Sequence, residues 1–215
     1  MNDFSPRRTM MVDTQVRPND VTKFTIIDAM LSVPREEFVP APLRDAAYVG
    51  ENLEISPGRV MLETRTLAKL LDALDPQPDD RVMILGAGLG YTAALVARMA
   101  GHVVAVEDVA DLATQAAARL NGLGNVTLAG GPLAAGAAKD GPYDCILVEG
   151  GAQDVPEAIL AQLKDGGRIG AVFMQGALGQ ARIGHHIDGK INWRFSFNAT
   201  APVLVGFVRK QGFTF

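Results

Sequence analysis

The sequence predicts an α/β fold in which helices cover a mostly parallel sheet. From about residue 80 onward, short apolar runs alternate with helical segments, and this βαβ pattern is typical of parallel sheets. Residues 81–107, RVMILGAGLGYTAALVARMAGHVVAVE, join an apolar strand, a glycine-rich turn, an alanine-rich helix and a second apolar strand. These two observations place at least one βαβ unit at the centre of the chain.

The first 78 residues differ in character and predict a helical, lid-like extension. Apolar residues at helical spacing predict a first helix, and they are Val21, Phe24, Ile27 and Leu31. Asp20 stands where it would cap the start of this helix, and prolines at positions 34, 40 and 42 predict a loop after it. A second helix is expected over residues 63–74.

Residues 79–175 predict the cofactor-binding core of the sheet. Strands are expected over residues 82–85, 102–106, 125–129, 144–148 and 168–173, helices over residues 108–121 and from near Pro156, and a loop over residues 149–154. In residues 176–215, the apolar runs 193–197 and 203–208 predict a terminal hairpin, with Trp193, Phe195 and Phe197 on one strand face. We therefore expect residues 1–215 to form a single domain.

Three glycines at alternate positions follow the first core strand. Gly86, Gly88 and Gly90 let the backbone turn sharply and approach a ligand, because no Cβ stands in the way. The helix that follows offers unpaired N–H groups at its start. At the end of the next strand, Glu107 is placed to accept hydrogen bonds from a ribose diol. The segment therefore predicts a pocket for a nucleotide-like cofactor.

The spacing of the glycines favours one class of cofactor. The pattern G-x-G-x-G differs from the dinucleotide pattern G-x-G-x-x-G. It suits the shorter loop of S-adenosylmethionine enzymes, whose cofactor has no pyrophosphate. A nicotinamide dehydrogenase stays open as an alternative that rests on fold analogy alone.

Composition limits the classes of partner. Hydrophobic residues at 48% and charged residues at 20% are typical of a soluble globular protein. The net charge of −4 argues against a general nucleic-acid binder, which needs a basic face. We expect a cytoplasmic protein, because we find neither a signal-peptide core nor an apolar run long enough to cross a membrane.

The cysteine and the histidines predict no reactive or metal site. The single cysteine, Cys145, is expected to be a packed thiol. His102 and the late-loop pair His185 and His186 lack a third ligand for a metal.

Several blocks, in order, resemble the protein-L-isoaspartate O-methyltransferase family over nearly the whole chain. They are AMLSVPREEFVP at 29–40, LGAGLGYTAAL at 85–95, VEDVADL at 106–112, LGNVTL at 123–128, PYDCILV at 142–148 and VPEAILAQLKDGGRI at 155–169. The resemblance implies a doubly wound, seven-stranded, mostly parallel sheet with a C-terminal antiparallel hairpin. It also implies transfer of a methyl group from S-adenosylmethionine to the carboxylate of isoaspartyl residues in damaged proteins, as a step of their repair.

The resemblance also assigns contacts to individual residues. The cofactor-binding residues that it implies are Leu85, Gly86, Ala87, Gly88, Gly90, Tyr91, Glu107, Asp108, Gly131 and Glu149. Ile84 stands in place of a family acid, Gly131 in place of an aspartate and Glu149 in place of a threonine. We expect Glu149 either to contact an amino group or to be an exposed loop acid. Arg35 is expected near the substrate.

The largest departure from the family lies in residues 53–64, LEISPGRVMLET. Leu62 stands where the family has a serine that contacts the substrate, so the catalytic residues stay unknown. Arg59 and Arg65 flank this position and are expected either to clamp a substrate carboxylate or to be solvated surface charges. Two functions therefore stay open: an isoaspartyl methyltransferase of reduced activity, acting on proteins or peptides as a monomer or weak dimer, and a binding or regulatory module that has lost catalysis.

Overall fold

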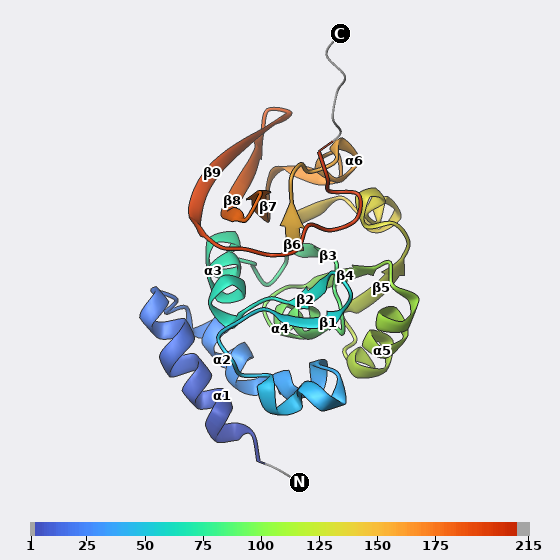
Figure 1. The fold of residues 1–215 in the computed structure, drawn as a ribbon. Helices are drawn as coiled ribbons and strands as arrows, with labels where there is room; N and C mark the ends of the chain where they lie inside the picture. Colours follow the sequence, from blue (N-terminus) through green and yellow to red (C-terminus); the bar gives the residue numbers. More distant parts are fainter. Residues whose placement is uncertain (1–2, 210–215) are drawn as a thin grey trace.

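Seven strands form the central sheet of the computed structural model, which describes residues 3–209 (Figure 1). Their order in the sheet is β5-β4-β3-β6-β7-β8-β9. The strands are β3 (Arg81–Leu85), β4 (His102–Glu107), β5 (Val126–Gly130), β6 (Tyr143–Ala152), β7 (Leu163–Gln175), β8 (Leu178–Ile187) and β9 (Lys190–Asn198). β3 to β7 run parallel, and β8 runs antiparallel to both of its neighbours. The predicted doubly wound, mostly parallel sheet is confirmed.

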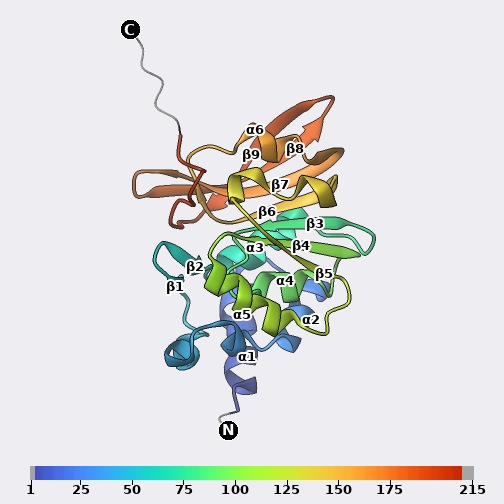
Figure 2. The same ribbon diagram turned by 90° about the vertical axis from the view of Figure 1, so that its right-hand side faces the viewer.

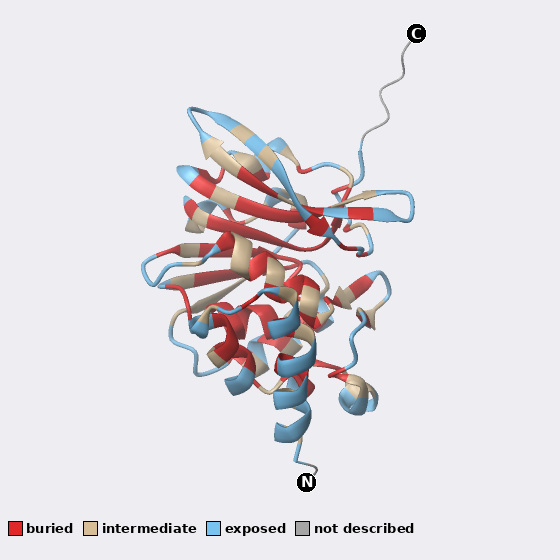
Figure 3. Cartoon of the chain, turned by 90° about the vertical axis from the view of Figure 1, so that its left-hand side faces the viewer, coloured by how far each residue is buried: buried red, intermediate tan, exposed pale blue. Residues whose placement is uncertain are grey.

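The central strands are apolar along their length because both faces of the sheet are covered. β3 and β4 pair in register from Arg81↔His102 to Leu85↔Val106, and residues 82–85 and 103–106 are all buried. A strand that is buried on both faces needs a continuous apolar run instead of an alternating one. Figure 3 shows these strands as a buried layer through the middle of the molecule.

Helices lie on both faces of the sheet (Figure 2). One face is covered by α3 (Thr64–Leu74), α4 (Tyr91–Val96) and α5 (Ala110–Leu120), and the other by α6 (Glu157–Leu160). Outside the first group pack α1 (Ser5–Met11) and α2 (Phe24–Ser32). Short helical turns span Val12–Val16, Arg17–Asn19, Arg35–Phe38, Ala41–Ala46, Leu133–Ala135 and Ala138–Asp140.

The N-terminal extension differs from its predicted form. α2 begins at Phe24 after Lys23, so Asp20, with a φ of 65°, does not cap it. The predicted apolar face is right at Val21 and Ile27, which are buried, and wrong at Phe24 and Leu31, which are exposed while Ile26 and Met30 are buried. α2 is covered by α1, α3 and α4 together, and these contacts select the buried face. The sequence did not predict α1.

Between the helical turns and α3 the chain forms a small hairpin. β1 (Leu53–Ser56) pairs antiparallel with β2 (Arg59–Met61), and Gly58 makes the turn with a φ of 70°. This conformation favours glycine, because a side chain in the left-handed region is strained. The hairpin extends the side chains of Ile55 and Arg59 to the glycine loop, as their contacts below show.

The loop predicted over residues 149–154 is largely strand. β6 continues through Ala152, because Gly151 and Ala152 pair with Val172 and Phe173 of β7. The terminal hairpin is also different from the prediction. β9 pairs with β8, which contains His185 and His186, whereas in the last apolar run Val203 makes a single bridge to Gly151.

The aromatic side chains of β9 divide between the two faces of the sheet. The ring of Trp193 packs against Phe173 at a centroid distance of 4.7 Å, and Phe197 belongs to the core on the opposite face. A bulge opposite Ala181 shifts the register of β9 between these two residues. The predicted single aromatic face is therefore wrong.

Candidate functional site

The glycine loop lies where the strand order of the sheet reverses. β3 has β4 on one side and β6 on the other, and such a switch point leaves a crevice at the carboxyl ends of the strands. Gly86, Gly88 and Gly90 have φ values of 85°, 57° and 96°. These values explain the three glycines, because other residues rarely adopt this backbone conformation. Gly90 is also the residue that precedes α4.

Glu107 ends β4 and points its carboxylate at this loop. Its Oε2 accepts a hydrogen bond from the N–H of Gly88 at 2.7 Å, and its Oε1 accepts one from the N–H of Val109 at 2.9 Å. The residue is buried, and burial raises the pKa of its carboxyl against the opposing effect of the Val109 N–H and the Arg59 guanidinium. The acid predicted to bind a ribose is thus fixed against the glycine loop.

Arg59 pairs with the two acids at the end of β4. Its Nη2 lies 2.6 Å from Oε2 of Glu107, and its Nη1 lies 2.7 Å from Oδ1 of Asp108. Only 6% of Arg59 is exposed, so it is not a solvated surface charge. Sequence reasoning missed this contact because the paired residues are 48 positions apart and no local pattern links them.

Side chains of the N-terminal and C-terminal segments fill the space above the glycines. A Cβ built on Gly88 would lie 2.7 Å from Cδ1 of Ile55, and one on Gly86 would lie 3.0 Å from Nη2 of Arg59 and 3.3 Å from Cδ1 of Leu204. The glycines and the acid that were predicted to form a cofactor pocket therefore lie together. Side chains of the chain itself, Arg59, Ile55 and Leu204, cover them.

Glu149 is buried near the end of β6 and is not the exposed loop acid that was one expectation. It is 4% exposed, and its Oε1 accepts a hydrogen bond from Thr92 Oγ1 at 2.7 Å. Its Oε2 has no hydrogen-bond partner. Burial raises the pKa of this carboxyl to about 8, against the opposing effects of the Thr92 hydroxyl and of Arg59 and Arg35. At neutral pH the group is therefore mostly uncharged.

Arg35 is fully buried, and it contacts two other segments of the extension and one residue of the core. Its Nε donates to the carbonyl of Ala47 at 2.7 Å, and its Nη2 donates to the carbonyl of Leu62 at 2.8 Å. Its guanidinium lies 4.9 Å from the centre of the Tyr91 ring. The third nitrogen, Nη1, has no partner.

Some of the other predicted site residues lie at the glycine loop, and others lie elsewhere. Leu62 is fully buried in the core, and Arg65 lies on α3, where its guanidinium donates to Glu63 and to the carbonyl of Asn198. Gly131 follows β5 with a φ of 132° and open space around it. Leu85, Ala87 and Tyr91 are buried at the loop itself.

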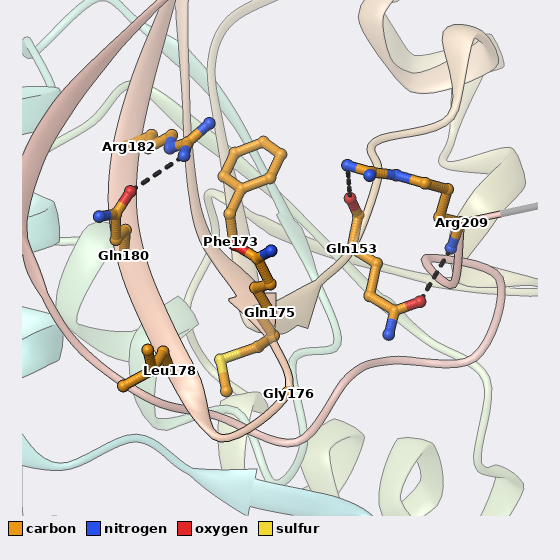
Figure 4. A pocket seen from close by; sticks show the side chains of 9 residues that line it. Gln153, Phe173, Gln175, Gly176, Leu178, Gln180, Arg182 and Arg209 are labelled. Atoms are coloured by element: carbon orange, nitrogen blue, oxygen red, sulfur yellow. Dashed lines mark hydrogen bonds between the residues drawn. The ribbon is translucent and has the colours of Figure 1, made fainter.

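A separate cavity of about 440 Å³ lies beside β7 and β8 (Figure 4). It is lined by Gln153, Phe173, Met174, Gln175, Gly176, Leu178, Gln180, Arg182 and Arg209. Its arginines are engaged by their neighbours, since Arg182 Nη2 donates to Gln180 Oε1 at 2.9 Å and Arg209 Nη2 donates to the carbonyl of Gln153 at 3.3 Å. It shares no residue with the predicted cofactor site.

Within residues 3–209, no group of three or more His, Cys, Asp or Glu side chains is arranged to hold a metal ion. None of the helices in that part of the chain combines the length and apolar character that a membrane span requires.

Solved structures with the same fold carry the same family name. The chain superposes on a protein-L-isoaspartate O-methyltransferase with a TM-score of 0.80 at 24% identity, covering 94% of this chain and 67% of that one. A putative protein-L-isoaspartate O-methyltransferase from Plasmodium falciparum, in complex with S-adenosyl-L-homocysteine, gives a TM-score of 0.79 at 18% identity, with 96% and 100% covered. At these identities the likeness establishes the fold.

Sequence comparison establishes the family. The model of the protein-L-isoaspartate(D-aspartate) O-methyltransferase family matches residues 7–182. The protein-L-isoaspartate O-methyltransferase of Methylorubrum extorquens (strain PA1) is 42% identical over 168 residues, covering 78% of this chain and 74% of that protein. The one from Staphylothermus marinus is 35% identical over 198 residues, covering 85% and 88%. The chain belongs to the protein-L-isoaspartate(D-aspartate) O-methyltransferase family.

Proposed function

We propose that this chain transfers a methyl group from S-adenosylmethionine to the carboxylate of isoaspartyl residues in proteins or peptides. The observation that carries the proposal is the buried carboxylate of Glu107, held against the glycine loop at the switch point of the sheet. Membership of the family supplies the type of reaction and of acceptor. The proposed setting is the repair of damaged proteins in the cytoplasm.

The residues proposed to hold the cofactor surround this loop. They are Leu85, Gly86, Ala87, Gly88, Gly90, Tyr91, Glu107, Asp108, Gly131 and Glu149. Glu107 suits a ribose diol because a carboxylate accepts two hydrogen bonds at once. The positive φ values of the glycines let the backbone approach the ligand without a Cβ between them.

Methyl transfer to a carboxylate requires the protein mainly to align the two reactants and to exclude water. S-adenosylmethionine supplies a methyl group on a sulfonium centre, which is an excellent leaving group. An acceptor carboxylate is ionised at neutral pH, so no strong general base is required. Its oxygen forms the new bond to carbon while the carbon–sulfur bond breaks and sulfur keeps the electron pair. The buried surroundings of Glu107, Tyr91 and Glu149 suit this step, because a dry site strengthens the electrostatic contacts.

Cofactor binding is expected to move the β1–β2 hairpin. The guanidinium of Arg59 forms an ion pair with Oε2 of Glu107, the oxygen that faces the loop, and Ile55 lies against Gly88. A ribose that binds Glu107 has to displace this guanidinium, so part of its binding free energy is used to break the ion pair.

A module without catalytic activity is the second candidate. Two points favour it. Arg59 already pairs with Glu107, and Leu62, which the resemblance aligns with the family's substrate-contacting serine, is a buried leucine. Such a module would retain the fold and the hairpin in the closed arrangement.

Calorimetry with S-adenosylhomocysteine, followed by methyl transfer to an isoaspartyl peptide and its aspartyl counterpart, tests the proposal. Binding together with transfer to the isoaspartyl peptide alone is the expected result. Binding without transfer would support the second candidate, and no heat at millimolar ligand would remove the methyltransferase function. Glu107→Ala is expected to abolish binding, whereas Glu157→Ala, an exposed position of α6, is expected to retain it.

A further inference from the structure

Arg35 carries a positive charge that no acid of the described chain neutralises directly. It is fully buried, and the ion pairs formed within residues 3–209 do not include it. Burial lowers the pKa of its guanidinium, yet such a group stays protonated in proteins. A buried cation without a partner is costly, so an anion is the natural complement of this position.

Three other buried side chains linked to Arg35 also have an unpaired polar atom. We define the Arg35 cluster as Arg35, Thr64, Tyr91 and Glu149, all buried, with Nη1, Oγ1, the phenol oxygen and Oε2 respectively lacking a hydrogen-bond partner. One contact and three further links connect its members. The Arg35 guanidinium lies over the Tyr91 ring, and Glu149 acts electrostatically on Arg35. Along the chain, Thr64 is two residues beyond the Leu62 carbonyl that Arg35 holds, and Glu149 is bonded to Thr92, the neighbour of Tyr91.

The chemistry of these atoms selects one class of ligand. The guanidinium Nη1 and the two hydroxyls can all donate hydrogen bonds, and an uncharged Glu149 adds a fourth donor. Buried donors without acceptors are rare, because each costs roughly the free energy of a lost hydrogen bond. A carboxylate satisfies them, since its two oxygens accept several hydrogen bonds and its charge balances the guanidinium. A cation is excluded by Arg35.

We propose that the Arg35 cluster is a carboxylate-binding site and that it holds the acceptor carboxylate during methyl transfer. The location agrees with this role, which rests on the proposed function. Tyr91 is the residue directly after Gly90, and the carbonyl of Glu149 lies 3.3 Å from a Cβ built on Gly86. The cluster therefore adjoins the glycine loop. In this arrangement Arg35 and Glu149 are positioned to bind the acceptor at the face where the family's serine is lost.

Tyr91→Phe is the sharpest variant, because it removes a hydroxyl that bonds to nothing in the structure. We expect unchanged thermal stability and roughly tenfold weaker binding of an isoaspartyl peptide, measured by calorimetry with and without S-adenosylhomocysteine. Tyr143→Phe is the matched control, since Tyr143 donates to the carbonyl of Ala137 at 2.7 Å and lies outside the cluster. It should lower stability and leave peptide affinity unchanged. A peptide whose isoaspartyl carboxylate is replaced by a carboxamide should bind neither the parent chain nor the Tyr143→Phe control.

Glu149→Gln supplies a second, pH-resolved measurement. The charged groups that face Glu149 are Arg35, Arg59 and Glu107. In the parent chain, peptide affinity should fall as the pH rises through about 8, because an ionised Glu149 repels the carboxylate. The glutamine variant keeps a donor and should bind with little dependence on pH between about 6 and 9.

The outcomes separate this inference from the proposed function. If S-adenosylhomocysteine fails to bind but the peptide still binds through its carboxylate and loses affinity in Tyr91→Phe, the proposed function fails and the carboxylate site stands. If Tyr91→Phe and Glu149→Gln both bind the peptide as the parent chain does at every pH, the cluster holds water only and the inference is overturned. Either result is obtained without cofactor binding.

Discussion

Arg59 places a positive charge at the carboxyl end of β4, where it forms ion pairs with Glu107 and Asp108. Both distances, 2.6 Å and 2.7 Å, are those of charge-assisted hydrogen bonds, and the side chain is almost wholly buried. A hydrogen bond to a charged group contributes about 1.5–3 kcal/mol net. A cofactor that needs Glu107 competes with an interaction of this size.

Removal of this competitor should therefore tighten cofactor binding. We expect Arg59→Gln to bind S-adenosylhomocysteine at least about tenfold more tightly than the parent chain, measured by calorimetry, while its free energy of unfolding falls by about 1–3 kcal/mol. Arg65→Gln, a change at the partly exposed arginine of α3, should leave affinity unaltered. Weaker binding in Arg59→Gln would mean that Arg59 helps to hold the ligand.

Glu149 should give the stability a measurable pH dependence. Its pKa in the folded chain is about 8, above the ordinary value of 4.5, so the folded state holds its proton more firmly than the unfolded state does. The associated stabilisation is complete below about pH 4.5 and is lost as the pH rises through about 8, a change on the order of 5 kcal/mol. Urea unfolding across this range should show the loss in the parent chain and not in Glu149→Gln. Parallel curves for the two proteins would contradict the assignment.

At the scale of elements, the β1–β2 hairpin and the glycine loop are packed as one unit. Ile55 lies so close to Gly88 that a Cβ at that glycine would be 2.7 Å from its Cδ1. The Ile55 side chain therefore has to shift if the loop gains bulk, whether from a mutation or from a ligand. Interiors packed at this density transmit such a displacement to their neighbours.

Gly88→Ala tests this packing. We expect it to lower the free energy of unfolding by about 2–3 kcal/mol, because it combines a strained positive φ with the overlap on Ile55. Adding Ile55→Ala should recover part of that loss, and a double-mutant cycle measures the coupling. The control is Gly58→Ala, which has a φ of 70° and no atom within 4 Å of the added Cβ. An equal loss at Gly58 would show that the contact with Ile55 contributes nothing.

Elements whose pattern is local were predictable from the sequence, and elements fixed by distant contacts were not. β3, the glycine turn and β4 follow from an apolar run, three glycines and a second apolar run that adjoin in the chain. The buried face of α2 depends on three other helices, which explains why Phe24 was misplaced. The same limit applies to the last part of the described chain. Residues 203–208 have the apolar pattern of a strand, but β9 pairs with β8 and not with them.

For the whole molecule, the site combines residues that sequence reasoning found with others that it described wrongly. Glu107 was predicted from its distance to the glycines, and it does face them. The environments of Arg59 and Glu149 were not predictable, because each depends on contacts with residues more than 45 positions away. Charge burial of this kind leaves no periodic pattern in a sequence.

Ligand binding should stabilise the whole fold. At a concentration about 100 times its dissociation constant, S-adenosylhomocysteine is expected to add about 2.7 kcal/mol, which for a chain of 215 residues raises the melting temperature by roughly 5–11 °C. Differential scanning fluorimetry measures this shift, with adenosine alone and NAD as comparison ligands. A shift from NAD without one from S-adenosylhomocysteine would revive the dehydrogenase alternative.

Arg35 and Arg59 both belong to the first 78 residues, whereas Glu149 and Glu107, the acids that they face, belong to the sheet. Through Arg59, the extension is therefore the counter-ion of Glu107 as well as the cover of the sheet edge. A chain shortened from its N-terminus past Arg59 would remove the ion-pair partner of Glu107 together with the side chains that cover the glycine loop. The strands of the core thus depend for their charge balance on a segment that lies outside them in the sequence.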